Sequence, residues 1–95
     1  MPLETTPFDP ARHLGRPQAQ AEMLTDAFET GDAGYIANAL GIVARARGMA
    51  EVARAAGVTR EALYRTLSME GDPKLTTLLG VMKALGVRLT AEAAG

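Results

Sequence analysis

Apolar residues in this 95-residue chain repeat at three- and four-residue steps, and the successive runs are separated by glycines. A repeat of this kind places apolar side chains on one face of an α-helix. Glycine readily adopts the left-handed backbone conformation that ends a helix. The pattern therefore predicts an all-α chain of five short helices, each followed by a glycine. These glycines are Gly31, Gly48, Gly57, Gly71 and Gly86.

The first expected helix starts at Pro17, because proline is accepted in the first helical turn, and runs to the residue before Gly31. Asp32 is expected to cap the second helix, since its carboxylate can accept hydrogen bonds from the free amides that follow it. This second helix should run to about Arg47. The four prolines in residues 1–17 disfavour a helix before it, so residues 1–16 are predicted to form an arm and residues 17–95 a single helical domain.

Two further short helices are expected to flank a tight turn, one over 49–56 and one from residue 60 to about residue 67. Gly57 permits the left-handed turn, Thr59 is a good cap, and Ala53 is small enough for two helices to cross there. This spacing is typical of a helix-turn-helix over residues 49–68. The apolar wedge between its helices consists of Val52, Val58 and Leu63.

The opposite side of the second helix of this pair carries side chains that can contact phosphates and base edges. Residues 42–65 hold five arginines against two glutamates, whereas residues 1–32 hold two arginines against six acidic residues. The positive charge therefore coincides with the helix-turn-helix, although exposed arginines also occur on solvated surfaces without a DNA partner. The predicted DNA-binding residues are Thr59, Arg60, Glu61, Tyr64, Arg65 and Ser68.

The sequence Gly71-Asp72-Pro73 predicts the start of a last helix, capped by Asp72 and with Pro73 in its first turn. Gly86 should end this helix. Its apolar stripe is expected to consist of Leu75, Leu78, Leu79, Met82 and Leu85. Residues 87–90, which follow Gly86, alternate between apolar and polar. This alternation predicts a short β-strand that pairs with a second copy of the chain or with another protein. The expected dimer interface is Val87, Arg88, Leu89 and Thr90.

Composition excludes several classes of function. With no cysteine and one histidine, His13, the chain offers neither a disulfide framework nor a zinc site, and no catalytic constellation can be assembled. We therefore expect no enzymatic activity, no metal and no cofactor. The N-terminus lacks a secretory signal and no apolar run is long enough for a membrane helix, which favours a cytoplasmic protein.

Several stretches together resemble a known family. They are Gly31-Asp32, Ile36-Ala-Asn-Ala-Leu-Gly41, Ala44-Arg-Ala-Arg-Gly-Met49, residues 57–68, Gly71-Asp-Pro73, Thr77-Leu-Leu79 and Lys83-Ala-Leu-Gly86. In this order they resemble the addiction-module antidote proteins, small antitoxins of the HigA-like group with a lambda-repressor/Cro-like (Xre-type) helix-turn-helix. Residues 8–14 also look like the short leader of that family.

The resemblance implies a five-helix lambda-repressor-like DNA-binding domain, to which the sequence adds a short C-terminal strand. It further implies an antitoxin of a type II toxin–antitoxin system that neutralises a RelE/ParE-like toxin and represses its own operon as a homodimer on an inverted-repeat operator of double-stranded DNA. The six predicted DNA-binding residues fall on the recognition-helix face of the family. The net charge of −1 leaves an alternative, an antitoxin that binds its toxin without sequence-specific DNA binding.

Overall fold

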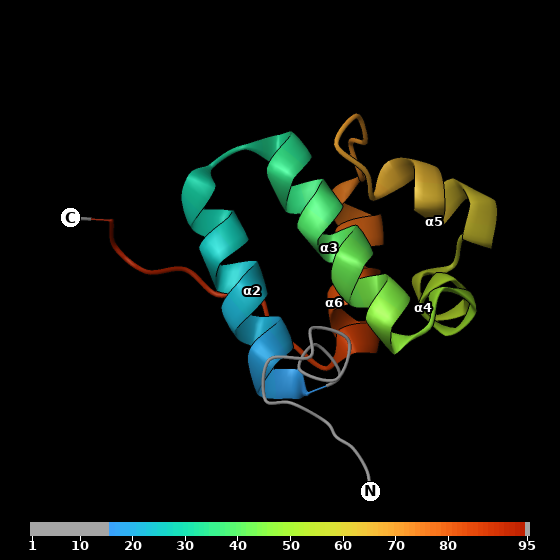
Figure 1. Ribbon diagram of the computed structural model, residues 1–95, viewed down its shortest axis with the longest axis horizontal. Helices are drawn as coiled ribbons and strands as arrows, with labels where there is room; N and C mark the ends of the chain where they lie inside the picture. The colour runs from blue at the N-terminus through green and yellow to red at the C-terminus, as the bar shows by residue number, and fades with distance from the viewer. Residues whose placement is uncertain (1–15, 95) are drawn as a thin grey trace, which may run out of the picture.

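The computed structural model describes residues 16–94, so most of the predicted arm, including His13, lies outside the described residues. The described part is all-α and contains five helices (Figure 1). Their bounds are α2 Pro17–Thr30, α3 Ala33–Arg47, α4 Met49–Ala56, α5 Arg60–Thr66 and α6 Leu75–Leu85. The prediction of five short helices is confirmed.

Three of the predicted helix starts are confirmed in detail. Pro17 occupies the first turn of α2. The Asp32 side chain accepts a hydrogen bond from the Tyr35 amide (2.9 Å), and the Thr59 hydroxyl accepts one from the Ala62 amide (3.0 Å). Each cap satisfies an amide that has no partner inside its own helix.

The start of α6 differs from the prediction. Lys74, and not Asp72, occupies the N-cap position, and its side chain makes no capping bond. Lys74 has an extended backbone (φ −64°, ψ 155°), so the helix begins after it, although Pro73 would have been compatible with a helical turn. Gly71 does not end a helix either, since α5 ends at Thr66; a side chain at Gly71 would collide with the carbonyl oxygen of Thr66.

One hydrophobic core joins all five helices. In Figure 1, α2 and α3 lie side by side, α6 passes behind α3, and α5 lies on the side of the molecule away from α2. Helix α4 packs chiefly on α6, and α2 packs chiefly on α3. Small residues let the backbones approach closely: a side chain at Gly41 of α3 would collide with the Leu67 carbonyl oxygen. The larger fully buried apolar residues are Leu24, Leu40, Val43, Val52, Leu63, Leu67, Val81 and Leu85.

The apolar stripe of α6 is rotated from the one predicted. Leu75 and Leu79 are 63% and 46% exposed. They lie on the edge of the buried face, and no other element in residues 16–94 covers them, because α4 and α3 pack against the side of α6 centred on Val81. The residues of α6 that pack in the core are Leu78, Val81, Met82 and Leu85.

Arg47, the last residue of α3, binds the C-terminal end of α6. Its Nη1 atom donates to the Ala84 carbonyl (3.0 Å), and its Nη2 atom donates to the Leu85 carbonyl (3.0 Å) and to Oε1 of the buried Gln20 (3.3 Å). The guanidinium therefore links α6 both to α3 and to α2.

The two preceding carbonyls of α6 are bound by the backbone that follows the helix. The Gly86 amide donates to the Lys83 carbonyl (3.1 Å), and the Val87 amide donates to the Met82 carbonyl (3.0 Å). Gly86 adopts the left-handed conformation that this arrangement requires (φ 74°). With Arg47, all four terminal carbonyls of α6 have a hydrogen-bond partner, a condition that buried helix ends normally meet.

After α6 the chain runs on without regular secondary structure and is exposed from Arg88 to Ala94 (Figure 1). Residues 16–94 contain no strand, so Val87–Thr90 has no pairing partner within this chain. A strand requires a second strand, and the predicted pairing with another chain stays a prediction. None of the helices in the described range is long and apolar enough to cross a membrane.

Candidate nucleic-acid interface

Helices α4 and α5 are the two short helices that were expected to flank a tight turn. Gly57 is left-handed (φ 76°), and its amide donates to carbonyls at the end of α4, while the Val58 amide donates to the Ala53 carbonyl (3.0 Å). The turn therefore consists of three residues, Gly57 to the Thr59 cap. Val52 and Leu63 are fully buried between the helices, as expected for the apolar wedge.

The outer side of α5 presents most of the predicted DNA-binding residues to solvent. Arg60, Glu61 and Arg65 are exposed, and Tyr64 is 44% exposed. Within residues 16–94, neither arginine side chain hydrogen-bonds or pairs with another residue. Guanidinium groups bind phosphate and guanine with two parallel hydrogen bonds.

The other two predicted residues are partly engaged within the protein. The Thr59 hydroxyl oxygen accepts the capping bond from Ala62, which leaves its hydrogen free to be donated. The Ser68 hydroxyl donates to the Arg65 carbonyl (2.9 Å), and Ser68 is only half-exposed. The structure thus brings the six residues together at one end of the molecule, and their role in DNA binding stays a prediction.

One member of the predicted basic group does not belong to this surface. Arg47 is half-buried and its guanidinium binds α6 and Gln20. Arg45 and Arg54 are exposed, as are the two arginines of α5. The charge count over residues 42–65 therefore overstated the basic surface by one arginine.

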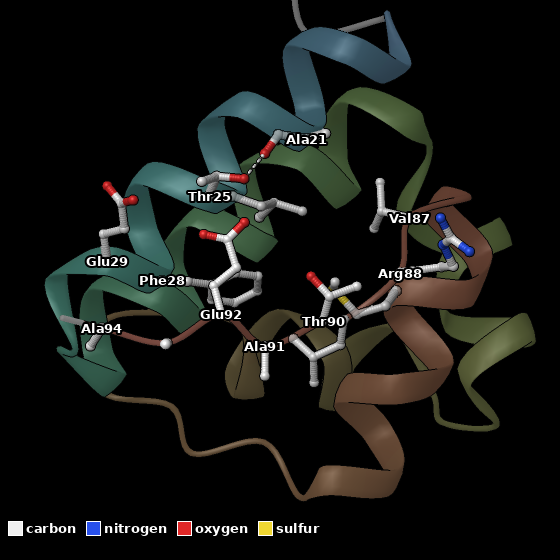
Figure 2. A pocket seen from close by; sticks show the side chains of 14 residues that line it. Ala21, Thr25, Phe28, Glu29, Val87, Arg88, Thr90, Ala91, Glu92 and Ala94 are labelled. Carbon is white, nitrogen blue, oxygen red and sulfur yellow. Dashed lines mark hydrogen bonds between the residues drawn. The ribbon is translucent and has the colours of Figure 1, made fainter.

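A second surface feature lies between α2 and the C-terminal segment, which we define as residues 87–94 (Figure 2). It is a groove of about 770 Å³, open to solvent. Leu24 and Phe28 of α2, Met82 of α6 and the C-terminal segment line this groove. Glu29 and Glu92 lie toward the C-terminal end of α2, and Arg88 lies near the C-terminal end of α6 (Figure 2).

The expected interface residues Val87–Thr90 all line this groove. Val87 packs against the core, and Leu89 is 45% exposed. The strand predicted from the sequence ends at Thr90. Apolar and polar residues continue to alternate through Ala91, Glu92 and Ala93, and this continuation would have extended the segment by three residues.

No group of three or more potential metal ligands occurs within residues 16–94. The acidic residues of α2, which are Glu22, Asp26 and Glu29, are exposed along one side of that helix. Carboxylates on such a surface can pair with a basic protein partner.

Comparison with known proteins identifies one family and one relative. The sequence model of a family described as "Probable addiction module antidote protein" matches residues 4–93. An uncharacterized protein of Haemophilus influenzae (strain ATCC 51907 / DSM 11121 / KW20 / Rd) is 39% identical over 85 residues, which cover 90% of this chain and 88% of the relative. No solved structure matches the chain.

Proposed function

Because this chain belongs to the family of probable addiction module antidote proteins, we propose that it is an antitoxin that also binds DNA. In this proposal it binds the DNA upstream of its own gene through α5, represses its own operon and neutralises a RelE/ParE-like toxin. It has no catalytic role of its own. An antidote of an addiction module acts on a toxin, so the family itself implies the protein partner.

The observation that carries the DNA-binding proposal is the exposed face of α5. Arg60, Tyr64 and Arg65 are exposed on a short helix that follows α4 after a three-residue turn. In helix-turn-helix proteins the second helix lies in the major groove, where arginine reads guanine and side chains bind the flanking phosphates. We propose that Arg60 and Arg65 contact phosphate or guanine, with Thr59, Glu61, Tyr64 and Ser68 setting the register.

A helix of seven residues contacts only a few base pairs, so we propose that the protein binds as a homodimer. A two-fold dimer presents its two recognition helices to successive major grooves, about 34 Å apart, and its operator is an inverted repeat. The proposed interface is Val87, Arg88, Leu89 and Thr90.

The toxin surface is a separate part of the proposal. The exposed carboxylates of α2 are complementary to a cationic protein, and an enzyme that acts on nucleic acid carries positive charge where it binds its substrate. Helix α2 lies away from α5 (Figure 1). The two partners would therefore bind at different sides of the molecule.

The test is fluorescence anisotropy of the purified protein with labelled DNA from upstream of its gene, compared with scrambled DNA over a range of salt concentrations. We expect specific binding that weakens steeply with salt, because each phosphate contact releases counterions. The Arg60→Ala and Arg65→Ala variants should each lose about 1–3 kcal/mol where the arginine reads a base, or lower the salt slope by about 1 where it binds phosphate.

The matched control is Arg16→Ala, which removes one exposed arginine at the start of α2, far from α5 (Figure 1). It should leave affinity for the specific DNA unchanged. Affinities in Arg60→Ala and Arg65→Ala equal to that of the control would refute the assignment of α5.

A second candidate is an antitoxin that binds its toxin and not a specific operator. The start of α4 favours it, because Glu51 places a negative charge in the first turn, where it would repel a DNA phosphate. Equal and weak binding to operator and scrambled DNA, together with tight binding of the toxin, would establish this alternative.

A further inference from the structure

The C-terminal segment has the properties of an unpaired β-strand. Its residues alternate from Val87 to Ala93, with apolar residues at every odd position and polar residues at 88, 90 and 92. In Figure 2, Thr90 and Glu92 project toward α2 and Ala91 projects to the opposite side, as alternation over residues 90–92 requires. Within the described residues, the backbone of 88–94 makes no hydrogen bond. Extended backbone with free amides and carbonyls is a template for a second strand.

The charges of this segment are complementary to a second copy of the same segment. Arg88 and Glu92 lie four residues apart with Thr90 midway between them. In an antiparallel pair related by a two-fold axis at Thr90, Arg88 of each chain lies opposite Glu92 of the other. We infer that the segment 87–93 pairs with its own copy in this register. A second chain of this protein therefore covers the free edge of the C-terminal segment.

Other symmetric registers lack this match. In an antiparallel ladder, neighbouring residue pairs alternate between hydrogen-bonded and non-hydrogen-bonded. A two-fold axis makes the pairs on either side of it equivalent, so the axis must pass through a pair formed by one residue and its own copy. An axis at Arg88 or at Glu92 places like charges opposite each other. An axis at Leu89 or at Ala91 leaves both charges opposite uncharged residues. Only the axis at Thr90 forms two ion pairs, with Thr90 opposite Thr90 between them.

In this register, apolar side chains also lie opposite apolar side chains. Val87 lies opposite Ala93, and Leu89 lies opposite Ala91, so one face of the two-stranded ribbon is apolar throughout and the other is polar. Cross-strand pairs of this type are the unit of stabilisation in antiparallel sheets. The inference rests on the homodimer of the proposed function and specifies its register, axis and charged pairs.

Charge reversal provides the test. In the full chain, the Arg88→Glu variant places two carboxylates opposite each other at both ends of the ribbon, and the Glu92→Arg variant places two guanidinium groups there. Each variant exchanges two attractive pairs for two repulsive ones. Sedimentation equilibrium should therefore show a dimer Kd raised on the order of ten- to a hundredfold.

Two rescues distinguish this register from a general effect of charge. The double variant Arg88→Glu/Glu92→Arg restores both pairs, so its dimer Kd should return to within a few-fold of the original. A mixture of the two single variants should form heterodimers in large excess over either homodimer, which native mass spectrometry resolves by mass. Lys83→Glu, a reversal on the exposed side of α6, is the control and should leave the Kd unchanged.

Cross-linking tests the axis without altering charge. The chain has no cysteine. Residues directly opposite each other in an antiparallel pair have Cβ atoms about 4.5–5.5 Å apart, within reach of a disulfide after small adjustments. Thr90→Cys should therefore form a disulfide-linked dimer under mild oxidation. Ala93→Cys should not, because its two copies lie three residues either side of the axis, about 20 Å apart.

Three results would overturn the inference: a protein that stays monomeric without its toxin up to millimolar concentration, single reversals that leave the Kd unchanged, and rescues that fail. The first would assign the segment to another partner, and the last would mean a dimer with a different register. Operator binding is measured on the same variants. A dimer that still binds its operator while both rescues fail would refute the register and leave the proposed function standing.

Discussion

The hydrogen bonds of Arg47 should contribute a large share of the stability of this protein. The Arg47→Ala substitution removes donors from the Ala84 and Leu85 carbonyls, each 3.0 Å from a guanidinium nitrogen, and a third contact, at 3.3 Å, with Gln20. Leu85 and Gln20 are fully buried. The substitution therefore leaves polar groups at the end of α6 without their partner, and it also removes a positive charge from the negative end of the helix.

The size of the effect follows from these contacts. A hydrogen bond from a charged donor contributes about 1.5–3 kcal/mol. Arg47 is half-buried, so water can reach part of the vacated space, and the lower end of that range applies to each carbonyl. We expect Arg47→Ala to lower the free energy of unfolding by about 2–4 kcal/mol. For a domain of this size that corresponds to a fall in Tm of roughly 10–25 °C.

Equilibrium urea unfolding followed by far-ultraviolet circular dichroism measures this free energy, with an unchanged slope m as evidence that the unfolded state is the same. Arg47→Lys keeps the charge but cannot donate to both carbonyls with the same geometry, and should lose about half as much. Arg45→Ala removes an exposed arginine two residues earlier and should change the stability by less than about 0.5 kcal/mol. Equal stability of Arg47→Ala and Arg45→Ala would refute the reasoning.

Three further predictions concern other parts of the molecule. Gly41→Ala should destabilise the protein by about 1–3 kcal/mol in urea, because its Cβ would collide with the Leu67 carbonyl oxygen, and a stability at or above the original would show that the helices separate freely. Thr59→Ala should cost about 0.5–2 kcal/mol by removing the α5 cap, whereas Thr59→Asp should keep the stability and weaken DNA binding, since a carboxylate caps the helix but repels phosphate. Amide hydrogen exchange should be faster in α2 than in α4 or α6, because α2 packs chiefly on α3, and equal protection in all three would contradict this.

The parts of the fold that depend on neighbouring residues could be predicted from the sequence. Asp32 and Thr59 cap helices through amides three residues away, and Gly57 and Gly86 turn the chain at the residue that requires a left-handed conformation. The face of α5 follows in the same way, because burial of Leu63 fixes which side of so short a helix is exposed.

The features that depend on distant residues could not be predicted. Arg47 was counted with the basic surface, since nothing near it in sequence indicates that it binds carbonyls 37 and 38 residues away. The exposure of Leu75 and Leu79 depends in the same way on where α3 and α4 lie across α6. Local patterns give the same helix in each case, and only the packing decides which of its sides is covered.

The connection between α6 and the C-terminal segment is short and fixed. Val87 packs against the core, and its amide is bound to the Met82 carbonyl, so the segment leaves the helical domain without a flexible linker. A dimer paired through this segment would therefore hold its two α5 helices at one separation and one relative rotation. Each base pair added between the two operator half-sites rotates one half-site relative to the other by about 35° about the DNA axis. If the proposed dimer binds an operator, it would tolerate changes of base sequence between the half-sites but not a change in the number of base pairs there.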